Sequence, residues 1–371
     1  MQTSDDYFRS EEFLNKLEEY ERAISEGAGI YMDINDLADI VDYYNSLKNY
    51  NGAMHAADVA LSLFPGAAAP LLFKARRALD EGDLAGAKRL AKQIEDKSQF
   101  EYAYLTAEIA IAQNDMNKSE KILLSSYANE TCDRDREDFS LDVAELYIDY
   151  GVYDLAGEWL ARCKDKSSAD FFELSGRRYY SIGNYDEARK NLNNLLDKNP
   201  YRYQAWNLLS TIQADKEDYS EAVTSCEYSL AIMPENIEGL LCMVRGLIGL
   251  DNIERATEFA LKAARTQVDE PNLYSRIMAM MIDAGYHRNA YDFFNYCKAN
   301  IMPYGLWDGY SYMAIACCEL DKMEEFEDNL RTAVINNPEE VKMAMGSILP
   351  AHLSEDEYFD YIVNYVKNKL K

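Results

Sequence analysis

A pattern of large and small residues recurs after 34 residues in the middle of this 371-residue chain. The stretch Ala169–Pro200 reads ADFFELSGRRYYSIGNYDEARKNLNNLLDKNP, and the stretch Tyr203–Pro234 repeats the same order of large, small and closing proline residues. Large residues three or four positions apart lie on one face of a helix, and a proline ends a helix. Each stretch therefore predicts two short helices that pack through their small residues, followed by a turn into the next unit.

The spacing of these residues resembles the tetratricopeptide repeat (TPR) family, whose 34-residue unit carries the pattern W-x₂-L-G-x₂-Y, then A-x₃-F and a closing proline. The residues that carry the resemblance are Phe172, Gly176, Tyr179, Gly183, Tyr185, Ala188, Leu192 and Pro200, then Trp206, Leu209, Ser210, Tyr219, Ala222, Cys226 and Pro234. The resemblance implies an all-α fold in which helix-turn-helix units stack into a right-handed superhelical solenoid.

The same register continues in both directions and predicts about nine TPR-like repeats over residues 34–340. The predicted repeats start at residues 34, 68, 100, 137, 169, 203, 237, 271 and 307. Because a stack of repeats needs end segments with a polar outer face, we expect an N-terminal capping helix in residues 1–33 and C-terminal capping helices in residues 341–371. The wider step before residue 137 predicts an exposed loop over Glu130–Asp138.

Both ends of the chain carry helix signals. Residues 4–26 predict one amphipathic helix, which Gly27 ends. Near the other terminus, Ser354 is followed three residues later by Glu357, which is a capping-box pattern and predicts the start of the last helix.

The chain is strongly acidic, with 65 acidic and 38 basic residues, a formal net charge of −27 and a pI near 4.5. We therefore expect neither nucleic acid nor an anionic membrane surface as a partner, because both attract basic surfaces. The charge serves solubility, or it attracts a basic partner where acidic residues cluster. No apolar run reaches the roughly 18 residues that a membrane span requires.

The seven cysteines include no Cys-x-x-Cys pair, which favours free thiols in a reducing compartment over a disulfide framework. The N-terminal segment MQTSDDYFRSEEF has neither the basic nor the apolar region of a signal peptide. We therefore expect a cytoplasmic protein. An exported protein whose signal has been removed is the alternative.

Residues suited to catalysis are sparse. None of the three histidines has another histidine or a cysteine at metal-ligand spacing. The sequence contains no phosphate-binding loop, zinc-protease or nucleophile-elbow motif. The run Asp133–Glu137 faintly resembles a calcium loop, but Asp138 stands where that loop requires glycine. The sequence therefore predicts no enzyme activity, no metal site and no cofactor.

The register also predicts a partner-binding surface. In the tetratricopeptide architecture the first helix of each repeat lines a concave groove, so fixed positions after each repeat start face a partner. The candidate groove residues are Asn45, Arg76, Tyr104, Glu108, Arg177, Tyr180, Gln204, Asn207, Thr211 and Arg245. The same register places further residues on this face, namely Asn35, Ala38, Asp42, Leu72, Leu79, Glu101, Leu141, Glu145, Glu173, Glu238, Leu241, Asn272, Ser275, Asp308 and Ser311. The arginines of this set could grip a partner's carboxylate, or they could pair with acidic side chains of the chain itself.

One kind of partner is excluded by the groove residues. The best-known groove of the family clamps the C-terminal carboxylate of a chaperone tail with lysines and asparagines. In the first three repeats, the clamp positions hold Ala38, Asp42, Phe73, Glu101 and Leu105. Because neither lysine nor asparagine stands there, a chaperone C-terminal tail is not the predicted partner.

The resemblance and the lack of catalytic residues predict a non-enzymatic protein–protein interaction scaffold. It would bind a peptide segment or a helix of another protein in its concave groove. The alternative is a structural module that self-assembles as a homo-oligomer through its ends or its convex face. The C-terminal residues Tyr358, Phe359, Tyr361 and Tyr365 motivate this alternative, because they give the last helix more apolar sides than one packing face needs.

Overall fold

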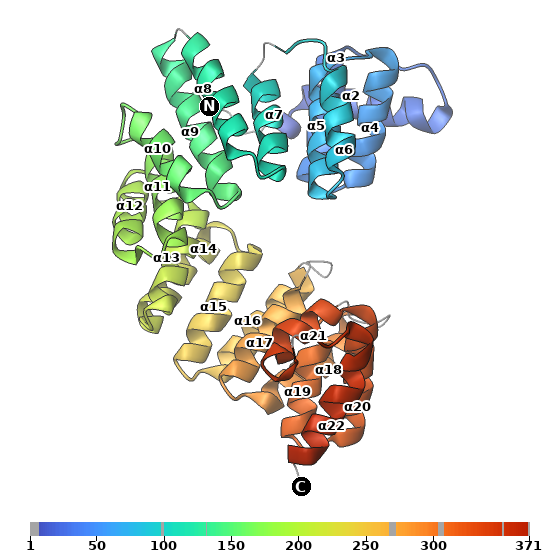
Figure 1. The fold of residues 1–371 in the computed structure, drawn as a ribbon, viewed down its shortest axis with the longest axis vertical. Coiled ribbons are helices and arrows are strands. Elements are labelled where there is room, and N and C mark those ends of the chain that lie inside the picture. The colour runs from blue at the N-terminus through green and yellow to red at the C-terminus, as the bar shows by residue number, and fades with distance from the viewer. Residues whose placement is uncertain are drawn as a thin grey trace. The chain divides into compact units, whose positions relative to one another are not determined.

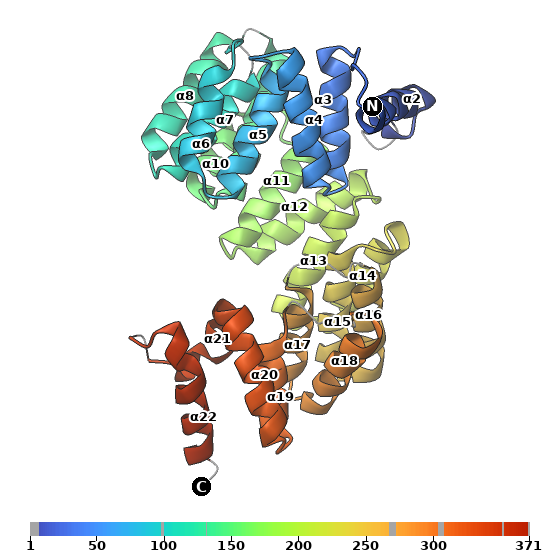
Figure 2. The ribbon, with the colours of Figure 1, turned by 90° about the vertical axis from the view of Figure 1, so that its right-hand side faces the viewer.

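The computed structural model describes residues 7–97, 100–130, 132–266, 272–302, 308–350 and 352–369. These residues form 21 α-helices and no strand, which confirms an all-α fold of helical repeats. The chain divides into two compact units, residues 1–165 and residues 166–371, and each is described by itself. Figures 1 and 2 show successive helices running back and forth within each unit. Within the described ranges, no helix is long and apolar enough to cross a membrane.

Unit 1 begins with a leading helix, which four helix pairs follow. Its helices are α2 (Glu11–Glu26), α3 (Ile34–Ser46), α4 (Tyr50–Leu63), α5 (Ala68–Asp80), α6 (Leu84–Gln93), α7 (Phe100–Ala112), α8 (Met116–Asn129), α9 (Asp133–Asp149) and α10 (Tyr153–Arg162). Each odd-numbered helix from α3 onward packs against the helix that follows it.

Unit 2 begins with five helix pairs and ends with two further helices. Its helices are α11 (Ala169–Ser181), α12 (Tyr185–Lys198), α13 (Tyr203–Asp215), α14 (Tyr219–Ile232), α15 (Ile237–Gly249), α16 (Ile253–Thr266), α17 (Leu273–Asp283), α18 (His287–Asn300), α19 (Tyr310–Glu319), α20 (Met323–Asn336), α21 (Pro338–Met345) and α22 (Tyr358–Lys369). Two short 3₁₀ helices, Gly346–Ile348 and Glu355–Glu357, lie between α21 and α22.

A residue with left-handed backbone conformation separates the two helices of each pair. These residues are Lys48, Gly82, Asn114, Gly151, Gly183, Glu217, Asp251, Gly285 and Asp321, with φ between 56° and 83°. Each lies 14 residues after a predicted repeat start. The next residue often caps the second helix: the side chains of Asn49, Asp83, Asp115 and Asn184 each accept a backbone N–H three residues on.

This constant spacing supports the predicted register. We propose on this basis that residues 34–340 form nine repeats between two end segments. The repeat starts predicted at residues 271 and 307 lie outside the described residues.

Replacing Gly183 by alanine should lower the free energy of unfolding by about 1 kcal/mol, because an L-residue in the left-handed region costs roughly 1–2 kcal/mol. A methyl group at residue 183 would have no neighbouring atom within 4 Å, so the variant isolates the backbone cost. The reverse change, Glu217→Gly, should stabilise by up to about 1 kcal/mol. Urea denaturation followed by circular dichroism measures both, and equal stability of Gly183→Ala and the wild type would contradict this account.

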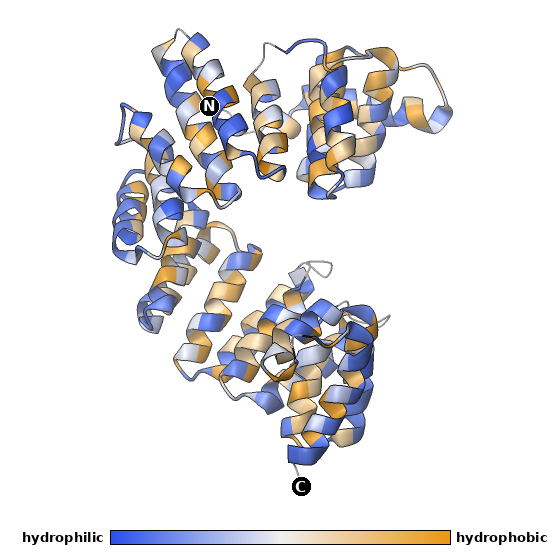
Figure 3. Cartoon of the chain, in the orientation of Figure 1, coloured by the Kyte–Doolittle hydropathy of each residue, from blue (hydrophilic) through white to orange (hydrophobic). Residues whose placement is uncertain are grey.

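Small residues allow the paired helices to approach closely. Gly176 on α11 is buried, and a methyl group there would lie 3.0 Å from Leu192 Cδ2 on α12. Ala188, which lies four residues before Leu192, is fully buried. Figure 3 shows hydrophobic and hydrophilic residues alternating along the helices, as amphipathic helices require. The core of each pair therefore depends on residue size as well as on hydrophobicity.

The predicted loop over Glu130–Asp138 is wrong for most of its length, because α9 begins at Asp133. The carboxylate of Glu137 accepts the backbone N–H groups of Lys164 at 2.9 Å and Asp165 at 3.0 Å. Acidic residues near a helix N-terminus complement the helix dipole, so the charged run extends α9 instead of forming a loop.

The leading helix differs from its prediction at its start. α2 begins at Glu11, where the side chain of Ser10 accepts the N–H of Phe13 and caps the helix. One continuous helix over residues 4–26 is therefore wrong. Gly27 has φ 62° and ends α2, as predicted.

The last helix follows its sequence signal. Ser354 and Glu357 form the predicted capping box, in which Ser354 N–H donates to Glu357 Oε2 at 3.0 Å. Ile362 and Val363 are buried on α22.

Candidate functional site

A hollow of about 420 Å³ lies along the first helices of the pairs in unit 1. Its lining residues are Asp42, Asn45, Ala69, Leu72, Phe73, Arg76, Arg77, Leu79, Asp80, Glu101, Glu108 and Tyr150. They come from α3, α5 and α7, and Tyr150 directly follows α9. We name this hollow the unit 1 groove.

The spacing of residues on α5 explains its share of the lining. Leu72, Arg76 and Leu79 are four and three positions apart, so they lie on one face of the helix. Of the ten predicted groove residues, Asn45, Arg76 and Glu108 line this hollow. Of the fifteen further residues that the register placed on the concave face, Asp42, Leu72, Leu79 and Glu101 also line it.

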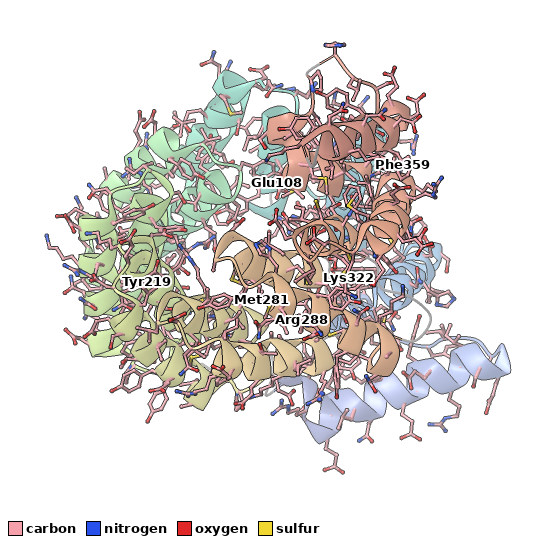
Figure 4. All side chains as sticks on the ribbon, turned by 90° about the horizontal axis from the view of Figure 1, so that it is seen from below. Glu108, Tyr219, Met281, Arg288, Lys322 and Phe359 are labelled. Atoms are coloured by element: carbon pink, nitrogen blue, oxygen red, sulfur yellow. The ribbon has the colours of Figure 1, made fainter. Side chains whose placement is uncertain are left out.

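Arg76 and Glu108 form the central ion pair of the unit 1 groove. Arg76 Nε lies 3.1 Å from Glu108 Oε2. The Glu108 side chain is 14% exposed and the Arg76 side chain 46%, so the arginine still faces solvent. Burial raises the pKa of Glu108, and the charge of Arg76 opposes that rise. Figure 4 labels Glu108, which comes from α7. Arg76 therefore pairs with an acidic side chain of its own chain.

The rest of the groove combines exposed carboxylates with apolar contacts. Asp42, Asp80 and Glu101 are exposed. With Glu108 they make four carboxylates against two arginines in the lining. Burial, together with the nearby charge of Glu108, raises the pKa of Tyr150 to about 12, so its hydroxyl stays neutral and able to donate. This composition suits a ligand that carries positive charge.

Tyr104 lies outside the lining of the unit 1 groove. Its ring stacks on Phe139 with the centroids 5.2 Å apart, and its hydroxyl donates to Asp142 at 3.4 Å. Burial and the charge of Asp142 raise the pKa of Tyr104. These contacts join α7 to α9, so Tyr104 has a packing role that the register did not predict.

Asn207 is the candidate whose surroundings least fit partner binding. It is 8% exposed, and its Oδ1 accepts the Ser229 hydroxyl at 2.6 Å. Thr211 is half-buried, and its hydroxyl donates to the Asn207 carbonyl at 3.0 Å. Both side chains thus satisfy polar groups within unit 2, and we do not propose Asn207 as a partner contact.

The remaining unit 2 candidates lie on α11, α13 and α15. Arg245 Nη1 lies 2.7 Å from Asp215 Oδ1, so this arginine also pairs within the chain. Burial raises the pKa of Tyr180, and the charge of Asp215 adds to the rise. Arg177 is half-buried and Gln204 is exposed. Tyr180 and Arg245 thus lie close to one carboxylate.

Phe73, Asp80 and Tyr150 line the unit 1 groove but were not among the predicted residues. Asp80 follows Arg76 by four positions, so the helical period could have placed Asp80 on the same face of α5. Phe73 was assigned to a clamp position and given no role of its own. Tyr150 lies after the end of α9, where the helical register no longer applies.

The family model for the tetratricopeptide repeat matches residues 174–237. No curated protein matches the chain. Similar solved structures include a tetratricopeptide repeat protein from Parabacteroides merdae, with 13% identity over 67% of this chain and 100% of that chain, and a TM-score of 0.47.

Two further similar structures have lower scores. MamA has 17% identity over 44% of this chain and 95% of its own, with a TM-score of 0.38. A thermophilic TPR protein from Thermus thermophilus has 16% identity over 55% of this chain and 100% of its own, with a TM-score of 0.35.

Paired helices joined by a left-handed residue define the class: the chain is an α-helical repeat protein. Within this class, residues 174–237 match the family model for the tetratricopeptide repeat, and the similar solved structures include tetratricopeptide repeat proteins. Proteins of this architecture present extended surfaces that bind other proteins.

Proposed function

We propose that the chain is a non-enzymatic scaffold whose unit 1 groove binds a peptide segment or helix of a partner protein with a lysine or arginine at its centre. The observation that carries this proposal is the lining of the groove, which combines four carboxylates with the apolar side chains of Leu72, Phe73 and Tyr150. A cytoplasmic location remains part of the proposal.

The charges of the groove favour a basic segment over an acidic one. Arg76 is held by Glu108, and Arg77 is shared by Asp80 at 3.4 Å and Glu81 at 3.3 Å. Asp42 and Glu101 are then the exposed carboxylates best placed to meet an incoming cation. Such contacts at a solvent-exposed rim contribute to specificity and association rate more than to affinity.

Reversing both exposed carboxylates tests the proposal. The double variant Asp42→Lys/Glu101→Lys should bind a basic partner segment at least about tenfold more weakly, a loss of about 1.4 kcal/mol. The matched control Glu19→Lys/Glu158→Lys makes the same change of charge at two exposed carboxylates outside the groove. The wild type, the groove variant and the control variant are compared by quantitative mass spectrometry of the proteins that each captures. Their binding of lysine-rich and arginine-rich peptides is then measured by fluorescence anisotropy.

The control separates the groove from the general acidity of the surface. Binding lost in the groove variant and kept in the control supports the proposal. Equal capture by all three proteins, or equal losses in both variants, would refute a specific role for the groove. Circular dichroism checks that each variant is folded.

Self-assembly remains the second prediction, but the last helix gives it little support. Tyr358 is buried, and the Arg331 guanidinium lies 4.4 Å from the centroid of the Phe359 ring, which Figure 4 labels. Tyr361 packs against the core of unit 2, and Tyr365 is 38% exposed. Most of these aromatic rings are therefore used within the chain, and static light scattering at high concentration tests the alternative.

A further inference from the structure

A second hollow in unit 1, of about 670 Å³, lies against a different side of α7 from the unit 1 groove. α6, α7 and α8 line it, and Figure 2 shows these helices next to one another. Along α7, Glu101 and Glu108 line the groove, whereas Tyr102 and Ile109 line the second hollow. We name it the outer hollow.

The outer hollow is basic although the chain is acidic. Its lysines are Lys88 and Lys92 on α6, Lys97 after α6, and Lys118 and Lys121 on α8. No aspartate, glutamate or arginine is among the described residues that line it. Among the described residues, none of these five ammonium groups forms a salt bridge. Such a concentration of unpaired lysines is unusual in a chain with 65 acidic and 38 basic residues.

The floor of the outer hollow is apolar. Ile109 is 6% exposed, and Tyr102 and Ile122 are half-buried. The ammonium of Lys97 lies 5.8 Å from the centroid of the Tyr102 ring. If the lysines served only to keep the helix surface soluble, the hollow between them would need no apolar side chains. A floor of this kind instead offers a place for one or two apolar side chains between the lysines.

We propose that the outer hollow binds an acidic segment of a partner protein, with an apolar side chain on the floor and flanking aspartates or glutamates against the lysines. Charge complementarity selects this occupant. Nucleic acid fits less well, because the net charge of −27 repels phosphates and because the described lining lacks the arginine forks that grip phosphate. The outer hollow is a separate site from the unit 1 groove, because the groove suits a positively charged segment and the outer hollow suits a negatively charged one.

The test uses the full chain and three labelled probes in fluorescence anisotropy. The first probe is a short peptide with two leucines among glutamates and aspartates. The second has lysines in place of the acidic residues, and the third is a short single-stranded oligonucleotide. We expect the acidic peptide to bind the wild type at the outer hollow, more tightly at low than at moderate salt, and the oligonucleotide not to bind.

Charge reversal locates the binding. Lys92→Glu/Lys121→Glu changes one exposed lysine on each side of the hollow and should weaken binding of the acidic peptide at least about tenfold. The control Lys198→Glu/Lys262→Glu makes the same change at two lysines of unit 2 and should bind as the wild type does. The groove variant Asp42→Lys/Glu101→Lys should bind the acidic peptide at least as tightly as the wild type. A negative result for the unit 1 groove therefore does not decide the result for the outer hollow, and the two proposals can be rejected separately.

Three outcomes would overturn the proposal. The acidic peptide could fail to bind, or could bind the lysine variant as tightly as the wild type. The oligonucleotide could bind more tightly than the peptide and be lost in the same variant, which would make nucleic acid the occupant. An oligomer of the wild type that the lysine variant converts to monomer would make a second copy of the chain the occupant. A photo-reactive acidic peptide that cross-links to α6, α7 or α8 would support the proposal independently.

Discussion

Replacing Glu120 by alanine should lower the free energy of unfolding of unit 1 by about 2–4 kcal/mol. Glu120 Oε2 accepts two hydrogen bonds, from the Tyr147 hydroxyl and from Trp159 Nε1, both at 3.0 Å. Tyr147 and Trp159 are fully buried. Alanine would leave Trp159 Nε1–H without this acceptor and would leave the Tyr147 hydroxyl with only the Ser119 hydroxyl, at 3.2 Å, as a partner. A buried unsatisfied polar group costs roughly 1–3 kcal/mol.

The conservative variant Glu120→Gln provides the control, because its amide oxygen still accepts a hydrogen bond. It loses the charge that lies 3.6 Å from Arg162 Nη2, a partly exposed ion pair worth about 1 kcal/mol or less. We therefore expect the order wild type, glutamine, alanine in decreasing stability. Hydrogen exchange of α8, α9 and α10 measures it, because this network joins those three helices. Equal exchange in all three proteins would contradict a stabilising network.

The helix pairs could be predicted from sequence because their determinants are local. Gly183 and Asn184 occur together, so the turn and the cap of α12 are both visible in the chain. At Lys48 and Glu217 the same backbone conformation carries a residue that gives no such signal. There the 34-residue register supplied the prediction that the single residue could not.

The contacts of individual polar side chains could not be predicted in this way. The register places Asn207 on the first helix of a pair but does not reveal that Ser229, from the second helix, donates to it. Tyr104 and Asp142 are 38 residues apart, and their hydrogen bond depends on how two pairs pack. A periodic pattern predicts which face a residue occupies, whereas a hydrogen-bond partner depends on distances across several helices.

The outer hollow was missed for a related reason. Its lysines occur on α6, after α6 and on α8, and no short window of sequence contains them all. The net charge of the whole chain pointed to a basic partner and concealed a local surface of the opposite sign. Only the packing of α6 and α8 on α7 brings these lysines to one place.

Unit 2 should become more stable as the pH falls from about 8 to about 5.5, by about 2 kcal/mol from Asp308 alone. Asp308 is 4% exposed, and its Oδ1 accepts the backbone N–H groups of Tyr274 at 3.1 Å and Ser275 at 3.2 Å. It thus caps the first turn of α17. Burial raises its pKa to about 7, the nearby Glu340 adds to the rise, and the two N–H donors oppose it.

The sign follows from proton binding. Between the ordinary aspartate pKa of 3.8 and about 7, the folded chain holds a proton at Asp308 that the unfolded chain has released. The stabilisation is therefore fully present below the ordinary pKa and is lost as the pH rises through about 7. Asp308→Asn keeps an oxygen acceptor for both N–H groups but cannot ionise, so it should remove this part of the pH dependence.

Hydrogen exchange of α17 and urea denaturation at both pH values test the role of Asp308. The exchange measurement is needed because repeat proteins can unfold in parts, so that a single free energy does not describe them. We expect wild type and Asp308→Asn to be similar near pH 5.5, and the variant to be the more stable near pH 8. A variant with the same pH dependence as the wild type would place the responsible proton elsewhere. A variant destabilised equally at both pH values would show that the cap needs a carboxylate rather than a neutral acceptor.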